Sequence, residues 1–186
     1  MGAALRLDTR LTEAEYFDFE LRGDARYEFA DGLVFAMVGG TDRHNLICGD
    51  FFLVLGTHLP LRCQVFEQSM KLRVTLDRTI RYFYPDILVS CRTTDRAPLF
   101  RAEPVLLGEV LSKSTEQSDR ADKLPFYRSI PALEEHVIVF QDIPQVELFR
   151  RRTSWQPEVF TMGQTMTLES VDLTIPVASL YRRVTF

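Results

Sequence analysis

Tyr84-Pro85-Asp86-Ile87-Leu88-Val89 begins the segment from which the fold is best derived, and Val105-Leu106-Leu107-Gly108-Glu109-Val110-Leu111 continues it. Each run is short, apolar and bounded by turn residues, which is typical of a buried strand. Each run also carries one acid, and a carboxylate inside an apolar run is costly unless it is paired, protonated or bound to a metal. Two neighbouring strands of this kind would bring both carboxylates to one point, where oxygen ligands suit a hard divalent cation.

Length and charge limit the class of protein. The 186 residues are enough for one domain with its own core, and we expect a single domain over residues 1–186. No apolar run approaches the roughly 20 residues of a membrane span, and we see no secretory signal. The net charge is −4, and residues 1–50 carry ten acids against five arginines. The excess of acids in residues 1–50 argues mildly against broad DNA contact by this part of the chain, but not against a local basic groove.

Three cysteines, Cys48, Cys63 and Cys91, are scattered along the chain. Their odd number and their spacing form no metal-binding pair and predict a reduced, cytoplasmic protein. We therefore expect all three to be small buried side chains.

Apolar periodicity and turn residues predict one α/β domain that borders on α+β. Thr12 and Thr41 are candidate caps for helices over about 12–21 and 41–58. A third helix is expected from about Ser118, where Pro125 should kink or shorten it. Asp31-Gly32 predicts a tight hairpin turn. We expect strands over residues 26–30, 33–37, 63–67, 70–76, 79–83, 136–140, 145–150, 155–162 and 166–174. The strands between 63 and 83 should form a meander, and the last two should pair with each other.

The acids of this framework match the requirements of metal-dependent phosphodiester cleavage. Carboxylates hold one or two divalent ions, and the metal lowers the pKa of a bound water. A nearby lysine orients that water or stabilises the developing charge. Asp86 and Glu109 are the candidate metal ligands, and Glu28 offers a third carboxylate from the hairpin. Lys123 offers the cation from the helix that follows the Glu109 strand, whereas we expect His44 to be structural.

An ordered set of short motifs carries a resemblance to a known family: Arg26-Tyr27-Glu28 with Asp31-Gly32, then His44, then Pro85-Asp86-Ile87-Leu88-Val89, then Glu109-Val110-Leu111-Ser112-Lys113-Ser114-Thr115 with Asp119 and Lys123, and Tyr127. From about Thr12 to Arg150 the chain resembles the Uma-two family of bacterial restriction endonuclease domains. That family belongs to the PD-(D/E)XK nuclease superfamily. Each motif alone is weak, and the ordered set is fairly specific.

The resemblance implies a restriction-endonuclease-like core, in which helices flank a mixed central sheet and the acids lie at one edge. It implies that Asp86, Glu109 and the accessory acid Glu28 hold Mg²⁺ or Mn²⁺. It further implies an endonuclease that hydrolyses phosphodiester bonds of DNA, although it supplies no known substrate.

The chain departs from the superfamily pattern near the second acid. The superfamily places a lysine two residues after that acid, and Leu111 stands there. The family pattern implies Lys123 as the substitute, with Lys71 and Lys113 as weaker candidates. Pro125 follows Lys123 closely enough to displace it. Gly108 also stands where a β-branched residue would pack better.

These departures leave two functions open. In the first, Glu28, Asp86, Glu109 and Lys123 are the catalytic residues of a nuclease. In the second, the chain is a catalytically inactive binding or assembly module of the same fold. Hydrolysis of another phosphodiester is a third, weaker hypothesis. For this fold, apolar sheet edges and the N-terminal hairpin predict self-association, with a dimer as the expected form.

Overall fold

The computed structural model describes residues 4–5, 10–23, 25–37, 39–112 and 116–186. Its α-helices are α1 (Glu13–Arg22), α2 (Asp42–His58) and α3 (Glu116–Ser129). The first two begin at the predicted caps, because the side chains of Thr12 and Thr41 accept hydrogen bonds from backbone N–H groups of the first turn. Across the residues that the structure describes, no helix combines the length and apolar character needed to span a membrane.

The strands occupy short segments along the whole chain. They are β1 (Ala4–Leu5), β2 (Tyr27–Ala30), β3 (Leu33–Ala36), β4 (Gln64–Glu67), β5 (Lys71–Leu76), β6 (Thr79–Phe83), β7 (Ile87–Ser90), β8 (Phe100–Arg101), β9 (Leu106–Leu111), β10 (Glu135–Phe140), β11 (Gln145–Arg150), β12 (Pro157–Thr161), β13 (Thr165–Leu168) and β14 (Leu173–Pro176). Short 3₁₀ helices are η1 (Arg151–Thr153), η2 (Glu169–Val171) and η3 (Val177–Leu180).

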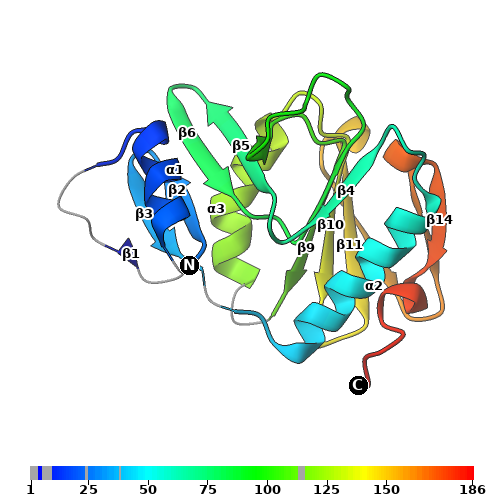
Figure 1. The fold of residues 1–186 in the computed structure, drawn as a ribbon. Coiled ribbons are helices and arrows are strands. Elements are labelled where there is room, and N and C mark those ends of the chain that lie inside the picture. The colour runs from blue at the N-terminus through cyan, green and yellow to red at the C-terminus, as the bar shows by residue number, and fades with distance from the viewer. Residues whose placement is uncertain (1–3, 6–9, 24, 38, 113–115) are drawn as a thin grey trace.

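The central sheet is mixed and has the strand order β12-β11-β10-β9-β7-β4. β9 and β10 run parallel, and the other neighbours are antiparallel. Parallel neighbours need a crossover, which α3 supplies between β9 and β10. Helix α2 covers one face of the sheet, and α3 covers the other (Figure 1). The predicted mixed sheet flanked by helices is confirmed.

Alternate residues of the central strands pack against the two helices. Ile87 and Val89 lie in the cluster formed with α2, whereas Leu88 and Leu107 lie in the cluster formed with α3. On the α2 side, a Cβ added at Gly108 would come within 2.8 Å of the Phe51 ring. The expectation that a β-branched residue would pack better at Gly108 is therefore wrong, because Phe51 fills that space.

A second sheet, with the order β1-β3-β2-β6-β5-β8, lies on the far side of α3 (Figure 1). Its β2–β3 hairpin turns at Asp31 and Gly32, whose φ angles are 48° and 91°. Two consecutive positive φ angles are what a type I′ turn requires, so the predicted hairpin is confirmed. α1 packs against this sheet through Tyr16, which is fully buried beside Phe29 and Tyr82.

Two strand pairings differ from the sequence prediction. β4 does not join β5 and β6 in a meander but pairs with β7 at the edge of the central sheet. At the C-terminus, β12 pairs with β11, and β13 pairs with β14. The expected strand over 166–174 is instead two strands, β13 and β14, separated by η2. These two pairings were predicted wrongly, because alternation fixes which face of a strand is buried and not which strand lies beside it.

Cys63 and Cys91 form a disulfide, and Cys48 is the free, buried cysteine. Antiparallel pairing sets Gln64 opposite Ser90, so the cysteines occupy the next facing positions of β4 and β7. The expectation of three reduced, buried thiols is wrong for this pair. Sequence spacing gave no indication of it, because the two cysteines meet only through a long-range strand pairing.

Candidate active site

Asp86 and Glu109 meet where β7 begins. The antiparallel register pairs Ile87 with Gly108, so the next position along each strand brings Asp86 opposite Glu109. The backbone N–H of Val110 donates to Asp86 Oδ2 at 2.8 Å. This bond fixes one carboxylate oxygen of Asp86 against β9 and leaves the other directed away from the strand pair.

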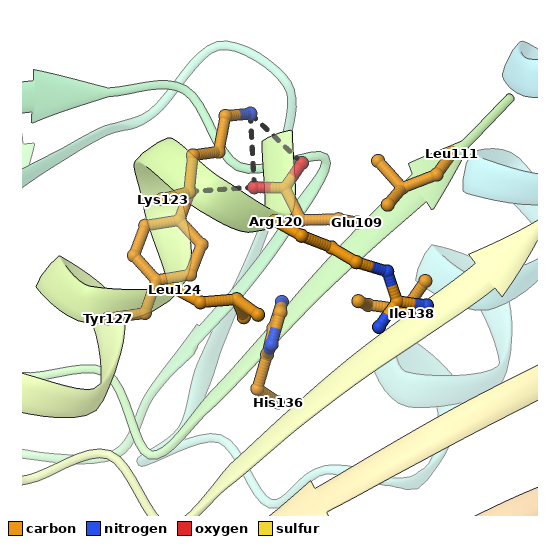
Figure 2. Close-up of a pocket in the computed structure, with 8 residues that line it drawn as sticks. All are labelled: Glu109, Leu111, Arg120, Lys123, Leu124, Tyr127, His136 and Ile138. Carbon is orange, nitrogen blue, oxygen red and sulfur yellow. Dashed lines mark hydrogen bonds and ion pairs between the residues drawn. The ribbon is translucent and has the colours of Figure 1, made fainter. Parts of the chain in front are cut away.

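Glu109 is only 4% exposed and has apolar neighbours along β9. The Tyr127 hydroxyl donates to Glu109 Oε1 at 2.6 Å, and Lys123 Nζ lies 3.3 Å from each carboxylate oxygen (Figure 2). Lys123 and Tyr127 are four residues apart on α3 and therefore project from one side of the helix. Burial, reinforced by the Glu109 charge, raises the pKa of Tyr127 well above its ordinary value, so its hydroxyl remains a donor. These partners satisfy the hydrogen-bonding capacity of a carboxylate that would otherwise be costly to bury.

Lys123 lies between two acids, because its Nζ is also 3.8 Å from Glu28 Oε1. The lysine reaches this position although Pro125 lies inside α3. Leu111, at the superfamily lysine position, is buried among apolar side chains. Of the weaker candidates, Lys71 pairs with Glu20 at 2.5 Å, and Lys113 lies outside the described residues. The geometry thus favours Lys123 over Lys71.

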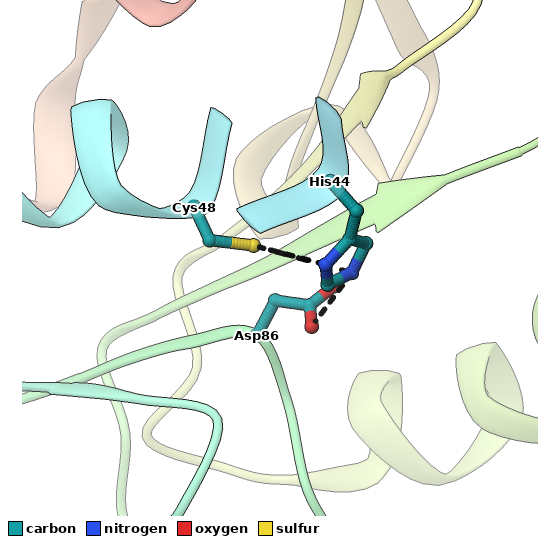
Figure 3. Close-up of side chains that lie close together, drawn as sticks. All are labelled: His44, Cys48 and Asp86. Carbon is teal, nitrogen blue, oxygen red and sulfur yellow. Dashed lines mark hydrogen bonds and ion pairs between the residues drawn. The ribbon is translucent and has the colours of Figure 1, made fainter. Parts of the chain in front are cut away.

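His44 and Cys48 approach Asp86 from α2 (Figure 3). His44 Nε2 lies 3.1 Å from Asp86 Oδ1, and Nδ1 lies 3.7 Å from Cys48 Sγ. Burial alone would lower the pKa of His44, but the hydrogen bond and charge of Asp86, with the Glu109 charge, outweigh it and raise the pKa. His44 thus contacts Asp86 much as Lys123 contacts Glu109, so each of the two acids has a basic side chain beside it.

A cavity of about 10 Å³ adjoins the buried side of Glu109. His136 of β10 lines it beside the ring of Tyr127, with a centroid distance of 5.5 Å (Figure 2). His136 is 3% exposed, and neither ring nitrogen has a hydrogen-bond partner in the described part of the chain. Burial, followed by the charges of Lys123, Arg128 and Arg120, lowers the pKa of His136 to about 3. The imidazole is therefore neutral near pH 7.

The sequence pointed to some of the further residues around the two acids and not to others. Tyr127 and His44 belong to the ordered motif set, but no motif indicated that they bond to the two acids. His136 is one of two polar residues at the start of the buried strand β10, beside Glu135, and its position in the sequence carried no functional signal. Only the parallel pairing of β9 with β10, which sets Ile138 beside Glu109, brings His136 near the site.

Carboxylate oxygens beside Lys123 and at the start of β7 are of the type that suits a hard divalent cation. Glu28, Asp86 and Glu109 offer carboxylate oxygens, the ligands that Mg²⁺ and Mn²⁺ prefer. Lys123 lies beside Glu28 and Glu109, so these two carboxylates already face a cationic group. The type of donor atom therefore suits such an ion, but the three carboxylates are not shown to converge: among the described residues, the group whose ligand atoms all lie within 4.8 Å of one another is His44, Cys48 and Asp86.

Comparison with known proteins gives a consistent family signal. The chain matches the family Uma2, described as "Putative restriction endonuclease", over residues 13–178. Two relatives come from Synechocystis sp., and both carry the name "Uncharacterized protein". One, slr1290, is 29% identical over 95% of this chain and 94% of its own length. The other, sll1609, is 30% identical over 76% of this chain and 81% of its own length.

A solved structure from Anabaena variabilis has a similar fold. It is described as a "putative nuclease belonging to DUF820" and superposes with a TM-score of 0.70. The match covers 92% of this chain and 98% of the other at 16% identity. At this identity the likeness concerns the fold alone, which supports the mixed α and β architecture described above.

Proposed function

Because the chain belongs to the Uma2 family, we propose that it is a metal-dependent nuclease that hydrolyses phosphodiester bonds of DNA. One observation carries the proposal: a buried carboxylate, Glu109, is held by Lys123 and Tyr127 next to a second acid on the neighbouring strand. An apolar strand does not need such an acid for its stability, since burying a charge costs free energy even when it is paired.

The proposal assigns a role to each group. Asp86, Glu109 and Glu28 hold Mg²⁺ or Mn²⁺, which when bound lowers the pKa of a water and offsets the charge of the phosphate. Lys123, held between Glu28 and Glu109, orients the attacking water and stabilises negative charge on the phosphate. Tyr127 is a positioning residue, because its hydroxyl fixes the Glu109 carboxylate from the buried side.

An inactive module of the same fold is the second candidate. It is favoured by one observation: both oxygens of Glu109 already lie within 3.3 Å of Lys123, and Oε1 also accepts from Tyr127. A carboxylate bonded in this way can be a structural ion pair. The two candidates differ in a single measurable property, which is turnover.

The test is cleavage of supercoiled plasmid DNA by the purified protein with Mg²⁺ or Mn²⁺. The variants Asp86→Asn, Glu109→Gln and Lys123→Met should each reduce cleavage by on the order of a hundredfold or more, as expected for loss of a metal ligand or charge-stabilising group. Glu103→Gln is the matched control, because its carboxylate pairs with Arg92 in a loop outside the site. Cleavage that persists in all three folded variants would exclude the proposed roles, and no cleavage by the unmodified protein across DNA substrates would favour the inactive module.

We also propose that the chain forms a homodimer. The exposed edge strand β12 supports this, because Val159 on it is 52% exposed and Met162 just beyond it is 46% exposed. Light scattering should give twice the chain mass of 21.5 kDa. A mass of one chain at high protein concentration would contradict self-association.

A further inference from the structure

His44, Cys48 and Asp86 form a compact group of three different ligand types (Figure 3). His44 and Cys48 are four residues apart on α2, so both side chains project from the same side of the helix toward the start of β7. His44 Nε2 lies 3.1 Å from Asp86 Oδ1 and 4.0 Å from Cys48 Sγ. One ligand atom from each residue can be chosen so that all three lie within 4.8 Å of one another.

These separations are close to those of a four-coordinate zinc site. Zinc binds nitrogen and oxygen at about 2.0–2.2 Å and thiolate sulfur at about 2.3 Å, in tetrahedral geometry. Ligand atoms in such a site are therefore roughly 3.3–3.6 Å apart. The nitrogen–oxygen and nitrogen–sulfur distances differ from this range by less than about half an ångström. The sulfur–oxygen separation is at most 4.8 Å, so rotation of the Cys48 and Asp86 side chains must close any remaining gap.

The surroundings also orient the ligands. The Val110 N–H holds Asp86 Oδ2, which leaves Oδ1 directed at His44. Such bonds to the non-coordinating atoms of a ligand are typical of metal sites. Cys48 is fully buried, whereas the side chains of His44 and Asp86 are 16% and 14% exposed. The group thus has a closed side at the sulfur and an open side through which an ion can enter.

We propose that His44, Cys48 and Asp86 bind one Zn²⁺ ion, with a fourth position open to water. Imidazole and thiolate select zinc over Mg²⁺, which prefers oxygen ligands. On binding, the Cys48 thiol loses its proton to solvent and the sulfur becomes a thiolate ligand; the coordinating nitrogen of His44 binds without a proton, which also passes to solvent where the ring was protonated. This site uses neither Glu109 nor Lys123. It shares Asp86 with the proposed nuclease site, so zinc bound here removes one ligand from a hard cation.

Cobalt(II) is the probe, because it replaces zinc and its thiolate complexes absorb in the near ultraviolet. Co²⁺ is titrated without oxygen into the full chain with its disulfide intact. Any thiolate-to-cobalt band then reports on Cys48, since Cys63 and Cys91 are joined to each other. We expect a band that saturates at one Co²⁺ per chain, disappears on addition of Zn²⁺ and survives excess Mg²⁺.

Four variants separate this site from its alternatives. Cys48→Ser, which nearly conserves volume, should lose the band, and His44→Ala and Asp86→Asn should raise the Co²⁺ concentration at half-saturation at least about tenfold. Glu109→Gln should keep the band even if it abolishes DNA cleavage, so failure of the nuclease proposal leaves this result unaffected. The zinc site is overturned if the unmodified chain gives no band at millimolar Co²⁺, or if the band is undiminished in both folded His44→Ala and Asp86→Asn.

Discussion

His136 is a buried residue whose ring nitrogens have no partner in the described part of the chain, and its pKa is lowered to about 3 by burial and by nearby cations. In the unfolded chain the ring titrates at its ordinary pKa of 6.5. Below that pH the unfolded state binds a proton that the folded state does not, so stability falls as pH drops from 6.5 toward 3. The loss from this group amounts to roughly 1 kcal/mol between about pH 7 and pH 5.5.

Replacing His136 by Phe should remove this loss. The Phe ring can stack on Phe149, which lies 5.9 Å from the imidazole by ring centroids, and it leaves no polar atom unsatisfied. We expect the unfolding free energy to rise by about 1–3 kcal/mol near pH 7 and to fall less steeply toward pH 5.5 than in the unmodified protein. Urea unfolding at both pH values measures the two effects.

His44 changes the folding stability with pH in the opposite direction to His136. Its pKa is raised in the folded state, so its stabilisation is complete below pH 6.5 and is lost as pH rises through the folded pKa. Both proteins contain His44, so subtracting the stability–pH profile of His136→Phe from that of the unmodified protein removes the contribution of His44. His58→Gln, at an exposed position, controls for loss of a histidine. Parallel pH profiles for the unmodified and His136→Phe proteins would contradict the assigned role of His136.

At single positions the sequence indicated which residues carry functional chemistry, but it did not indicate which side chains fill a given volume of the core. An acid within an apolar run pointed to Glu109, because a buried charge needs a reason. The same approach misjudged Gly108, since Phe51, which a strand pattern does not reveal, occupies the volume of a Cβ. Leu111 illustrates the same limit: the family pattern named Lys123 as the substitute lysine, but only the structure shows that Lys123 contacts Glu109 from the crossover helix.

At the scale of elements, local sequence signals predicted the positions of helices and strands well, but they predicted poorly which strands pair with each other. Caps at Thr12 and Thr41 and the Asp31-Gly32 turn act within a few residues, so the sequence displays them directly. The pairing of β4 with β7 joins segments that are distant in the chain and depends on which strands bury their faces together. The disulfide could not be predicted for the same reason, because Cys63 and Cys91 come together only when β4 pairs with β7.

The disulfide should stabilise the edge of the central sheet. It closes a loop with a sequence separation of 28 residues, and restricting the unfolded chain in this way contributes about 3–4 kcal/mol. We expect reduction of the denatured protein to expose three titratable thiols, against one without reductant. Urea unfolding with reductant should show a correspondingly lower midpoint.

Cys63→Ser with Cys91→Ser provides the matched control, because this variant should be indifferent to reductant. Three reactive thiols in the unreduced, denatured protein would contradict the bond. That outcome would restore the expectation of a fully reduced chain.

Across the whole molecule, the C-terminal segment is joined to α2, the helix that also carries His44 and Cys48. Asp50 of α2 is fully buried, and its Oδ1 accepts from Arg183 Nη2 at 2.8 Å and from Arg182 Nη2 at 3.2 Å. Arg182 and Arg183 lie 132 and 133 positions after Asp50 in the chain, and the three side chains form one ion cluster. The red C-terminal end of the ribbon runs beside α2 accordingly (Figure 1).

Removing both arginines should therefore leave a buried, unpaired charge. Arg182→Ala combined with Arg183→Ala is expected to lower the unfolding free energy by about 1–3 kcal/mol, because the buried Asp50 carboxylate loses its partners while the arginine side chains themselves are about half exposed. Asp50→Asn in that background should recover part of the loss, because a neutral amide costs less to bury than a carboxylate. Urea unfolding at pH 7 compares the three proteins, with Arg92→Ala plus Arg96→Ala as a control for loss of two exposed arginines. If Asp50→Asn instead lowers the stability of the double variant further, the carboxylate has another partner and the C-terminal segment is held by packing of residues such as Tyr181, which is buried in the α2 cluster.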